Sequence, residues 1–162
     1  MVLPPTATAA DTASALRWAR RLIEVYPEPD FTVRQGDDVY LQRWYVIPRN
    51  DVRNVYLHRF LRSDDARAMH DHRGDNTSWI LDGKYREHSG VYREDGTILL
   101  LPSRMRGPSD LVERRGTDLH RVELITEIVL SLFFIGPCIR EWGFACPQGW
   151  MSQKEYLERG GC

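Results

Sequence analysis

The chain has 162 residues, 42% of them hydrophobic, which is enough for one domain with a full core. Its 22 lysines and arginines face 23 aspartates and glutamates, and the net charge of −1 creates no overall field that attracts nucleic acid or an anionic membrane. The longest apolar run, residues 128–135, is too short to cross a bilayer and too late in the chain for a signal peptide. We therefore expect a soluble protein with no nucleic-acid or membrane partner.

The first ten residues are small and rich in proline, and we expect them to be loose. A helix is predicted over residues 12–26, with Asp11 as its cap and Pro27 as its end. Its apolar residues recur at helical spacing, at Ala15, Leu16, Ala19, Leu22 and Ile23.

After Pro29 the apolar pattern changes to a period of two, which is typical of β-strands. Turn-forming residues separate seven segments rich in Val, Ile, Tyr, Trp and Phe: residues 39–47, 54–62, 77–81, 85–92, 97–101, 119–125 and 128–135. A short helix is predicted over residues 152–159. The pattern indicates an all-β antiparallel sandwich or barrel. We expect the tail and helix of residues 1–30 to pack on a single barrel domain formed by residues 31–162, which includes a C-terminal extension.

The cysteines, Cys138, Cys146 and Cys162, are odd in number and form no C-x-x-C pair. This pattern favours a reducing compartment over a disulfide framework. We expect a cytoplasmic protein in which Cys138 and Cys146 are buried apolar cysteines.

The strongest functional signal is the pair His70 and His72, separated by one residue. In an extended strand, alternate side chains project to the same face about 6 to 7 Å apart, so both imidazoles can reach one metal ion. His120 is followed by apolar residues two and four positions later, as expected of an inward-facing strand residue. Three imidazoles suit Fe, Zn, Ni or Cu better than Mg or Ca. We predict one divalent transition metal at this site.

These residues resemble the motifs of the cupin superfamily. The first cupin motif runs Gly, five residues, His-x-His, three or four residues, Glu, six residues, Gly. His70, His72 and Gly83 fit it, Asn76 stands in the Glu position and Asp64 in the leading Gly position. The second motif is matched at its histidine, His120, while Arg115-Gly-Thr117 replaces the Pro-x-Gly turn and Leu124 the closing Asn. The resemblance covers roughly residues 38–136.

The chain also resembles a subgroup of small cupin-domain proteins of phage and bacterial genomes. The shared segments are Leu57-His-Arg-Phe60, His70-Asp-His72, Gly83-Lys-Tyr85 and Trp142-Gly-Phe144. This closer likeness implies no activity.

The cupin resemblance implies a double-stranded β-helix, or jelly-roll barrel, and it suggests further ligands and a homodimer. Either Asn76, in the Glu position, or Asp75, one residue earlier, could complete the metal site, and Asp75 is also a candidate catalytic residue. The activity that the resemblance implies is that of a metal-dependent dioxygenase, with Fe(II) favoured and Zn or Ni as alternatives. A small polar substrate and dioxygen would take the open positions. The alternatives are an isomerase, epimerase or lyase, and a non-catalytic binding protein with a structural metal or none.

Four further residues are candidates for the site. His88 could act as a base beside the metal ligands, and Arg59 could bind a substrate carboxylate or phosphate. Ser78 shares the strand face of Asn76, while Trp79 and Leu81 face the opposite side. Trp142 could line a ligand site together with Arg140. The alternatives to these site roles are structural: His88 and Arg59 could lie on the surface, and Trp142 could be an aromatic plug at a sheet edge.

Overall fold

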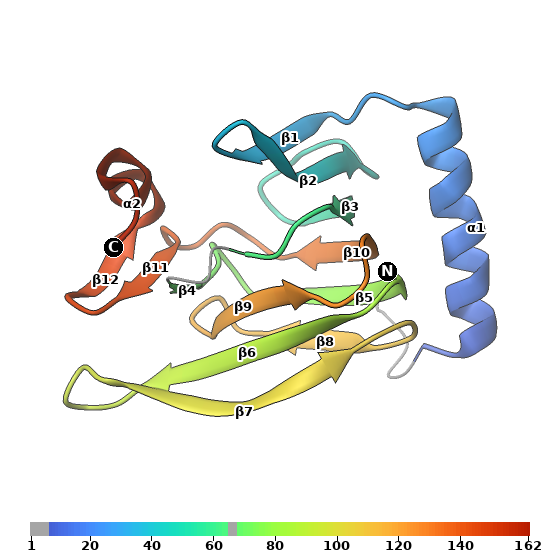
Figure 1. The fold of residues 1–162 in the computed structure, drawn as a ribbon. Coiled ribbons are helices and arrows are strands. Elements are labelled where there is room, and N and C mark those ends of the chain that lie inside the picture. The colour runs from blue at the N-terminus through green and yellow to red at the C-terminus, as the bar shows by residue number, and fades with distance from the viewer. Residues whose placement is uncertain (1–6, 65–67) are drawn as a thin grey trace.

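The computed structural model of the protein describes residues 7–64 and 68–162, so part of the tail predicted to be loose lies outside the described residues. Two antiparallel sheets face each other, and the long helix α1 stands beside one of them, whereas α2 lies at the C-terminal end (Figure 1). The predicted jelly-roll arrangement with an N-terminal and a short C-terminal helix is confirmed.

Each sheet has six strands, and neighbours in a sheet are far apart in the chain. The first sheet has the order β1 (Phe31–Gln35), β2 (Asp38–Tyr45), β3 (Asn54–Phe60), β10 (Val129–Ile135), β5 (Asn76–Asp82) and β8 (Leu111–Arg114). The second has the order β12 (Gly149–Ser152), β11 (Gly143–Cys146), β4 (Met69–His70), β9 (Leu119–Leu124), β6 (Tyr85–Tyr92) and β7 (Ile98–Arg106). All seven predicted segments form strands, and β4 carries His70 of the pair that was expected in an extended strand. Strands β1, β8, β11 and β12 were not predicted.

Helix α1 (Ala9–Val25) covers the outer face of the first sheet. Its fully buried Ala19 packs against the buried cluster that includes Trp44 and Leu81, and the other predicted apolar residues of the helix pack against the same cluster. The helix starts earlier than predicted. Thr8, not Asp11, is the N-cap, and Asp11 completes a capping box with it.

Strand β5 shows how alternation separates the two sides of the first sheet. Leu81 packs under α1, and Trp79 Nε1 donates a hydrogen bond to Thr12 Oγ1 at 3.1 Å. On the opposite side, Ile80 packs in the cluster between the sheets, and Asn76 and Ser78 share its face. The predicted assignment of this strand's two faces is therefore confirmed.

The C-terminal extension folds back on the second sheet. Strands β11 and β12 form a hairpin, and α2 (Gln153–Arg159) starts at the cap residue Ser152. A disulfide joins Cys146 to Cys162, and Cys138 is free and exposed. The prediction that Cys138 and Cys146 are buried thiols is wrong, because Cys138 is exposed and the chain end brings Cys162 to Cys146 of β11. The cysteine argument for a reducing compartment falls with it. Among the described residues, no helix has the length and apolar character needed to span a bilayer.

Candidate metal centre

The three predicted histidines converge between the sheets. His70 ends β4 and pairs directly with His120 of β9, while the backbone N of His72, just beyond β4, donates to Gly116 O at 2.9 Å. One potential ligand atom from each histidine lies within 4.8 Å of the other two. The ring centroids are 4.6 Å apart for His70 and His120, 5.0 Å for His72 and His120, and 5.2 Å for His70 and His72. This geometry allows all three imidazoles to bind one ion.

Several polar atoms of this cluster are buried without a hydrogen-bond partner. Within the part of the chain that the structure describes, these atoms include both ring nitrogens of His120 and Nδ1 of His72. Leaving a buried nitrogen unsatisfied costs about 1 to 3 kcal/mol, so such groups call for a ligand. A bound metal would satisfy His72 Nδ1 and His120 Nε2, because His120 Nδ1 lies beside the Glu87 carboxylate. The residues present therefore fit the ion predicted from the sequence.

Burial keeps the imidazoles of His120 and His72 neutral, which is the form that binds metal. Burial lowers the pKa of His120 to about 3, and the nearby charge of Arg114 acts in the same direction. Burial also lowers the pKa of His72 well below its usual value, with further contributions from His120 and His70.

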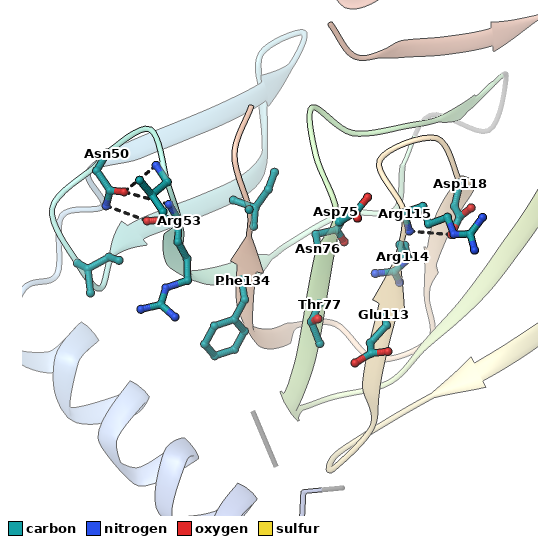
Figure 2. A pocket seen from close by; sticks show the side chains of 14 residues that line it. Asn50, Arg53, Asp75, Asn76, Thr77, Glu113, Arg114, Arg115, Asp118 and Phe134 are labelled. Atoms are coloured by element: carbon teal, nitrogen blue, oxygen red, sulfur yellow. Dashed lines mark hydrogen bonds between the residues drawn. The ribbon is translucent and has the colours of Figure 1, made fainter. Parts of the chain in front are cut away.

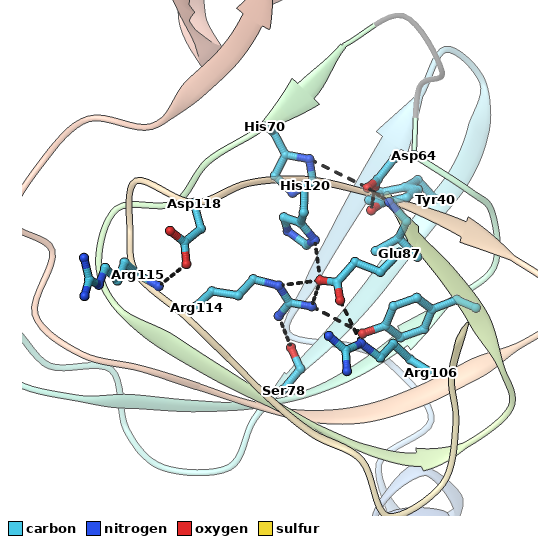
Figure 3. A network of polar contacts seen from close by, with 12 residues as sticks. Tyr40, Asp64, His70, Ser78, Glu87, Arg106, Arg114, Arg115, Asp118 and His120 are labelled. Atoms are coloured by element: carbon cyan, nitrogen blue, oxygen red, sulfur yellow. Dashed lines mark hydrogen bonds and ion pairs between the residues drawn. The ribbon is translucent and has the colours of Figure 1, made fainter. Parts of the chain in front are cut away.

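A carboxylate stands behind each of two histidines (Figure 3). Glu87 Oε1 lies 3.4 Å from His120 Nδ1, and Asp64 Oδ2 lies 3.7 Å from His70 Nδ1. Both carboxylates thus face Nδ1, which leaves Nε2 of each ring for the common centre. Carboxylates in this position fix the ring orientation of metal-binding histidines and make the ligands more basic.

Glu87, on β6, is itself held by two arginines. Its Oε1 accepts a hydrogen bond from Arg114 Nε at 2.8 Å, and its Oε2 accepts one from Arg106 Nε at 2.8 Å. Burial alone would raise the pKa of the Glu87 carboxyl, but contacts with His120 and Arg114 lower it well below its usual range. The carboxylate behind His120 is therefore charged across the ordinary pH range.

Of the two candidates for a fourth ligand, Asn76 offers a free acceptor. Its side chain is buried, Nδ2 donates to Gly74 O at 3.2 Å, and Oδ1 has no partner among the described residues. Asp75 is exposed, its Oδ1 accepts from Gly116 N at 2.9 Å, and it lies outside the three-histidine group. The structure thus does not bring Asp75 to the histidines.

His88 and Arg59 also lie away from the cluster, because alternation turns each outward. His88 is the neighbour of inward-facing Glu87, and its Nε2 lies 2.7 Å from Glu123 Oε2 on the other side of the sheet. Arg59 donates to Gln42 Oε1 at 2.7 Å, and its guanidinium lies 5.5 Å from the ring centroid of Trp44. His88 and Arg59 therefore have the surface role that the sequence analysis gave as the alternative to a role in the site.

The other two substrate candidates do reach the interior. Ser78 is buried, and its Oγ accepts a hydrogen bond from Arg114 at 3.2 Å. The half-buried ring of Trp142 stands edge-on to His70, with centroids 6.1 Å apart.

Arg140 does not share this position with Trp142. Its Nη1 lies 2.8 Å from Asp71 Oδ2 and donates to the carbonyl oxygens of His72, at 2.9 Å, and Gly116, at 3.1 Å. Arg140 therefore fixes the loop that carries His72 and does not line a ligand site.

Two depressions approach this region. An open groove of about 800 Å³ runs over the strand ends between the turn at Asn50 and the turn at Arg115, and Asn76 and Arg114 form part of its lining (Figure 2). A smaller cavity of about 210 Å³ is lined by Glu87, Arg114 and His120, among others. Glu113, Arg114 and Asp118 line both depressions, so the groove adjoins the cavity beside the histidines.

Sequence reasoning did not assign a site role to Glu87, Asp64 or Arg114. A signal existed for Glu87, since alternation along the predicted strand of residues 85–92 puts it opposite His88. Asp64 was noted only as the residue in the place of a motif glycine.

Comparison with known proteins shows the fold. No protein-family model matches the chain, and no curated protein sequence matches it significantly. Among solved structures, the DMSP lyase DddQ from Ruegeria pomeroyi DSS-3 is 16% identical with a TM-score of 0.61, covering 91% of this chain and 74% of that chain.

Two further structures give the same result. A cupin-like protein from Thermotoga maritima is 14% identical with a TM-score of 0.51, covering 81% of this chain and 93% of that one. Oxalate decarboxylase from Bacillus subtilis, a protein with Mn(II) centres, is 14% identical with a TM-score of 0.52, covering 82% of this chain and 32% of that one. The chain therefore has the cupin double-stranded β-helix fold, which hosts many different functions.

Proposed function

We propose that this protein is a mononuclear metal enzyme that acts on a small polar molecule. One observation carries the proposal: three imidazoles converge, those of His72 and His120 have buried nitrogens without a partner among the described residues, and carboxylates stand behind His70 and His120. A histidine cluster that served only the core would have its nitrogens paired within the protein.

The side chains around the centre have distinct roles in this proposal. His70, His72 and His120 hold a divalent transition ion, and Asn76 Oδ1 is the candidate for a further ligand. When bound, the ion supplies Lewis acidity and, if it is redox-active, electron transfer. Glu87 and Asp64 orient two of the imidazoles, and Phe133, whose ring centroid is 5.8 Å from that of His72, limits the access of water.

The first reaction to test is the oxygen-dependent oxidation of a bound substrate, with Fe(II) as the metal. Three protein ligands leave open coordination positions for a chelating substrate and for dioxygen. The donors also suit Zn and Ni, so the metal found in the purified protein discriminates between redox and non-redox chemistry.

The neutral ligand set favours a second candidate, an oxygen-independent lyase or isomerase. Asn76 occupies the place of the carboxylate that a cupin motif would supply, so the imidazoles leave the charge of a divalent ion largely uncompensated. An ion in such a site acts as a strong Lewis acid towards a substrate oxygen. The similarity to a structure described as a DMSP lyase is compatible with this second candidate.

The test is metal analysis of protein purified without chelators or added metal, followed by binding of Fe(II), Zn(II) and Ni(II) to the metal-free form. We expect about one ion per chain, and we expect His120→Ala and His72→Ala to lose it. His88→Ala is the matched control, because His88 lies on the outer face of the second sheet. If His120→Ala binds metal as tightly as the unaltered protein, the proposed centre is wrong.

Turnover then separates the two reaction classes. Oxygen uptake by the Fe(II) protein with candidate small acids and alcohols supports oxidation, whereas product formation in a strictly anaerobic chamber supports the lyase or isomerase. A metal-loaded protein inactive in both assays would favour the non-catalytic alternative.

A further inference from the structure

We propose that Arg43 and the hydroxyl groups of Tyr45 and Tyr56 form a binding site for a carboxylate group of a small organic acid. This inference rests on the proposed function, since it names the chemical class of the substrate: a molecule that reaches the metal centre with one end and carries a carboxylate at the other. The reasons lie in the charge, the surroundings and the position of Arg43.

Arg43 is an inward-facing cation without a counter-ion. Among residues 7–64 and 68–162 it forms no ion pair, whereas Arg106, Arg114 and Arg140 all pair with carboxylates. Its Nε donates to His58 Nε2 at 2.9 Å, and its guanidinium carbon lies 4.5 Å from the ring centroid of Tyr56. These contacts fix the guanidinium, and no described residue accepts a hydrogen bond from either of its terminal nitrogens.

The cost of this arrangement points to a ligand. Burial lowers the pKa of Arg43, and the neighbouring tyrosines, Tyr56 first among them, offset this effect only in part. An arginine of this kind binds a carboxylate through two parallel hydrogen bonds. An anionic ligand would thus supply the missing counter-charge.

The neighbouring side chains add positive charge and hydroxyl groups. The rings of Tyr45 and Tyr56 lie 5.5 Å apart, and no hydrogen bond from either phenol is found among the described residues. The guanidinium of Arg49 lies 5.7 Å from the ring centroid of Tyr45. The carboxylate of Asp30 accepts a hydrogen bond from Tyr45 N at 2.7 Å, so it is engaged with the backbone and not with Arg43.

Position links Arg43 to the metal centre. Arg43 of β2 pairs directly with His58 of β3. The ring of His58 stacks on Phe133 with centroids 5.0 Å apart, and Phe133 contacts His72 at 5.8 Å. The rings of His58 and Phe133 therefore lie between Arg43 and His72, on the inward side of the first sheet, so the cation and the metal ligand share this face.

His58 keeps the cation in place. Burial lowers the pKa of His58 well below its usual value, and the charge of Arg43 lowers it further. The neutral imidazole can thus accept the hydrogen bond from Arg43 Nε and does not compete with the ligand for the terminal nitrogens.

The test uses isothermal titration of the full-length chain with propionate, succinate and benzoate, each compared with its uncharged amide. We expect at least one of the three acids to bind and its amide to bind at least about tenfold more weakly. Arg43→Gln should lose about tenfold or more in affinity for that acid, and Arg43→Lys, which keeps the charge, should lose less. Arg59→Gln, one position from His58 but on the outer face, is the matched control.

The outcomes separate this site from the metal centre. Acid binding that depends on Arg43 should persist in metal-free protein, and metal affinity should be unchanged in Arg43→Gln. If no metal binds but acid binding still requires Arg43, the carboxylate site stands and the proposed enzyme function fails. This inference is overturned if none of the three acids binds at a concentration of 10 mM, which corresponds to a binding free energy weaker than about 3 kcal/mol. It is also overturned if Arg43→Gln binds the acid as tightly as the unaltered protein does.

Discussion

The substitution Glu87→Gln tests the link between the buried ion pairs and the metal centre. The Glu87 side chain is only 4% exposed and that of its partner Arg114 only 5%, so removal of the negative charge leaves a buried cation without compensation. Breaking a buried pair in this way costs about 3 to 5 kcal/mol. Because Gln keeps the shape and one acceptor, we expect a loss of about 3 kcal/mol in the free energy of unfolding, measured by urea denaturation of the metal-free protein.

The same substitution should weaken metal binding, since the carboxylate behind His120 is gone. Loss of such an outer partner typically lowers metal affinity about 10- to 100-fold, which competition with a chromophoric chelator measures. Glu123→Gln is the matched control, because Glu123 contacts His88 on the opposite face of the same two strands, and it should change neither quantity appreciably. Equal metal affinity in Glu87→Gln and the unaltered protein would refute the assigned role of Glu87.

Two further predictions concern stability. His58 is neutral in the folded protein because its pKa is lowered, so the unfolded chain takes up a proton as the pH falls below about 6.5. The metal-free protein should therefore lose stability below that pH. His58→Gln should reduce the slope of the free energy of unfolding against pH by up to about 1.4 kcal/mol per pH unit. Equal slopes for His58→Gln and the unaltered protein, measured by denaturation at several pH values, would contradict this. Cys162→Ser breaks the disulfide, which spans a sequence separation of 16 residues, and should lower the free energy of unfolding by about 3 kcal/mol and the melting temperature with it. Cys138→Ser, at an exposed free thiol, is the control and should leave the melting temperature unchanged. A melting temperature unchanged by Cys162→Ser would count against the disulfide.

The sequence predicts most of the fold because the period-two pattern is strong wherever a strand has one apolar face. The strands that were missed are those in which this signal is weak. Strand β8 has only four residues, Leu111–Arg114, and β1, Phe31–Gln35, is an edge strand that alternates between polar and apolar residues with little burial. The cap of α1 was misplaced because Thr8 and Asp11 are both good cap residues, and only the backbone geometry shows which one occupies the cap.

The site was predicted in part because His-x-His spacing fixes the relative direction of two side chains. The His-x-His spacing does not show which face of a neighbouring strand points inward. Arg59 was therefore proposed as an inward-facing residue, whereas the inward-facing residue of β3 is its neighbour His58. Glu87 and Arg114 are distant in sequence and meet only because β6 and β8 lie in facing sheets. The disulfide likewise depends on the path of the chain end, which no spacing rule specifies.

Strand β10 has a consequence for the order in which the molecule opens. It lies between β3 and β5, it has α1 beyond one face and the second sheet beyond the other, and its first five residues are all buried. Amide protons there can exchange with solvent only when large parts of both layers separate, so they should report global unfolding. Phe133 lies in this strand, for which we expect the slowest exchange. Its ring should therefore stay beside His72 while the hairpins at the periphery fluctuate.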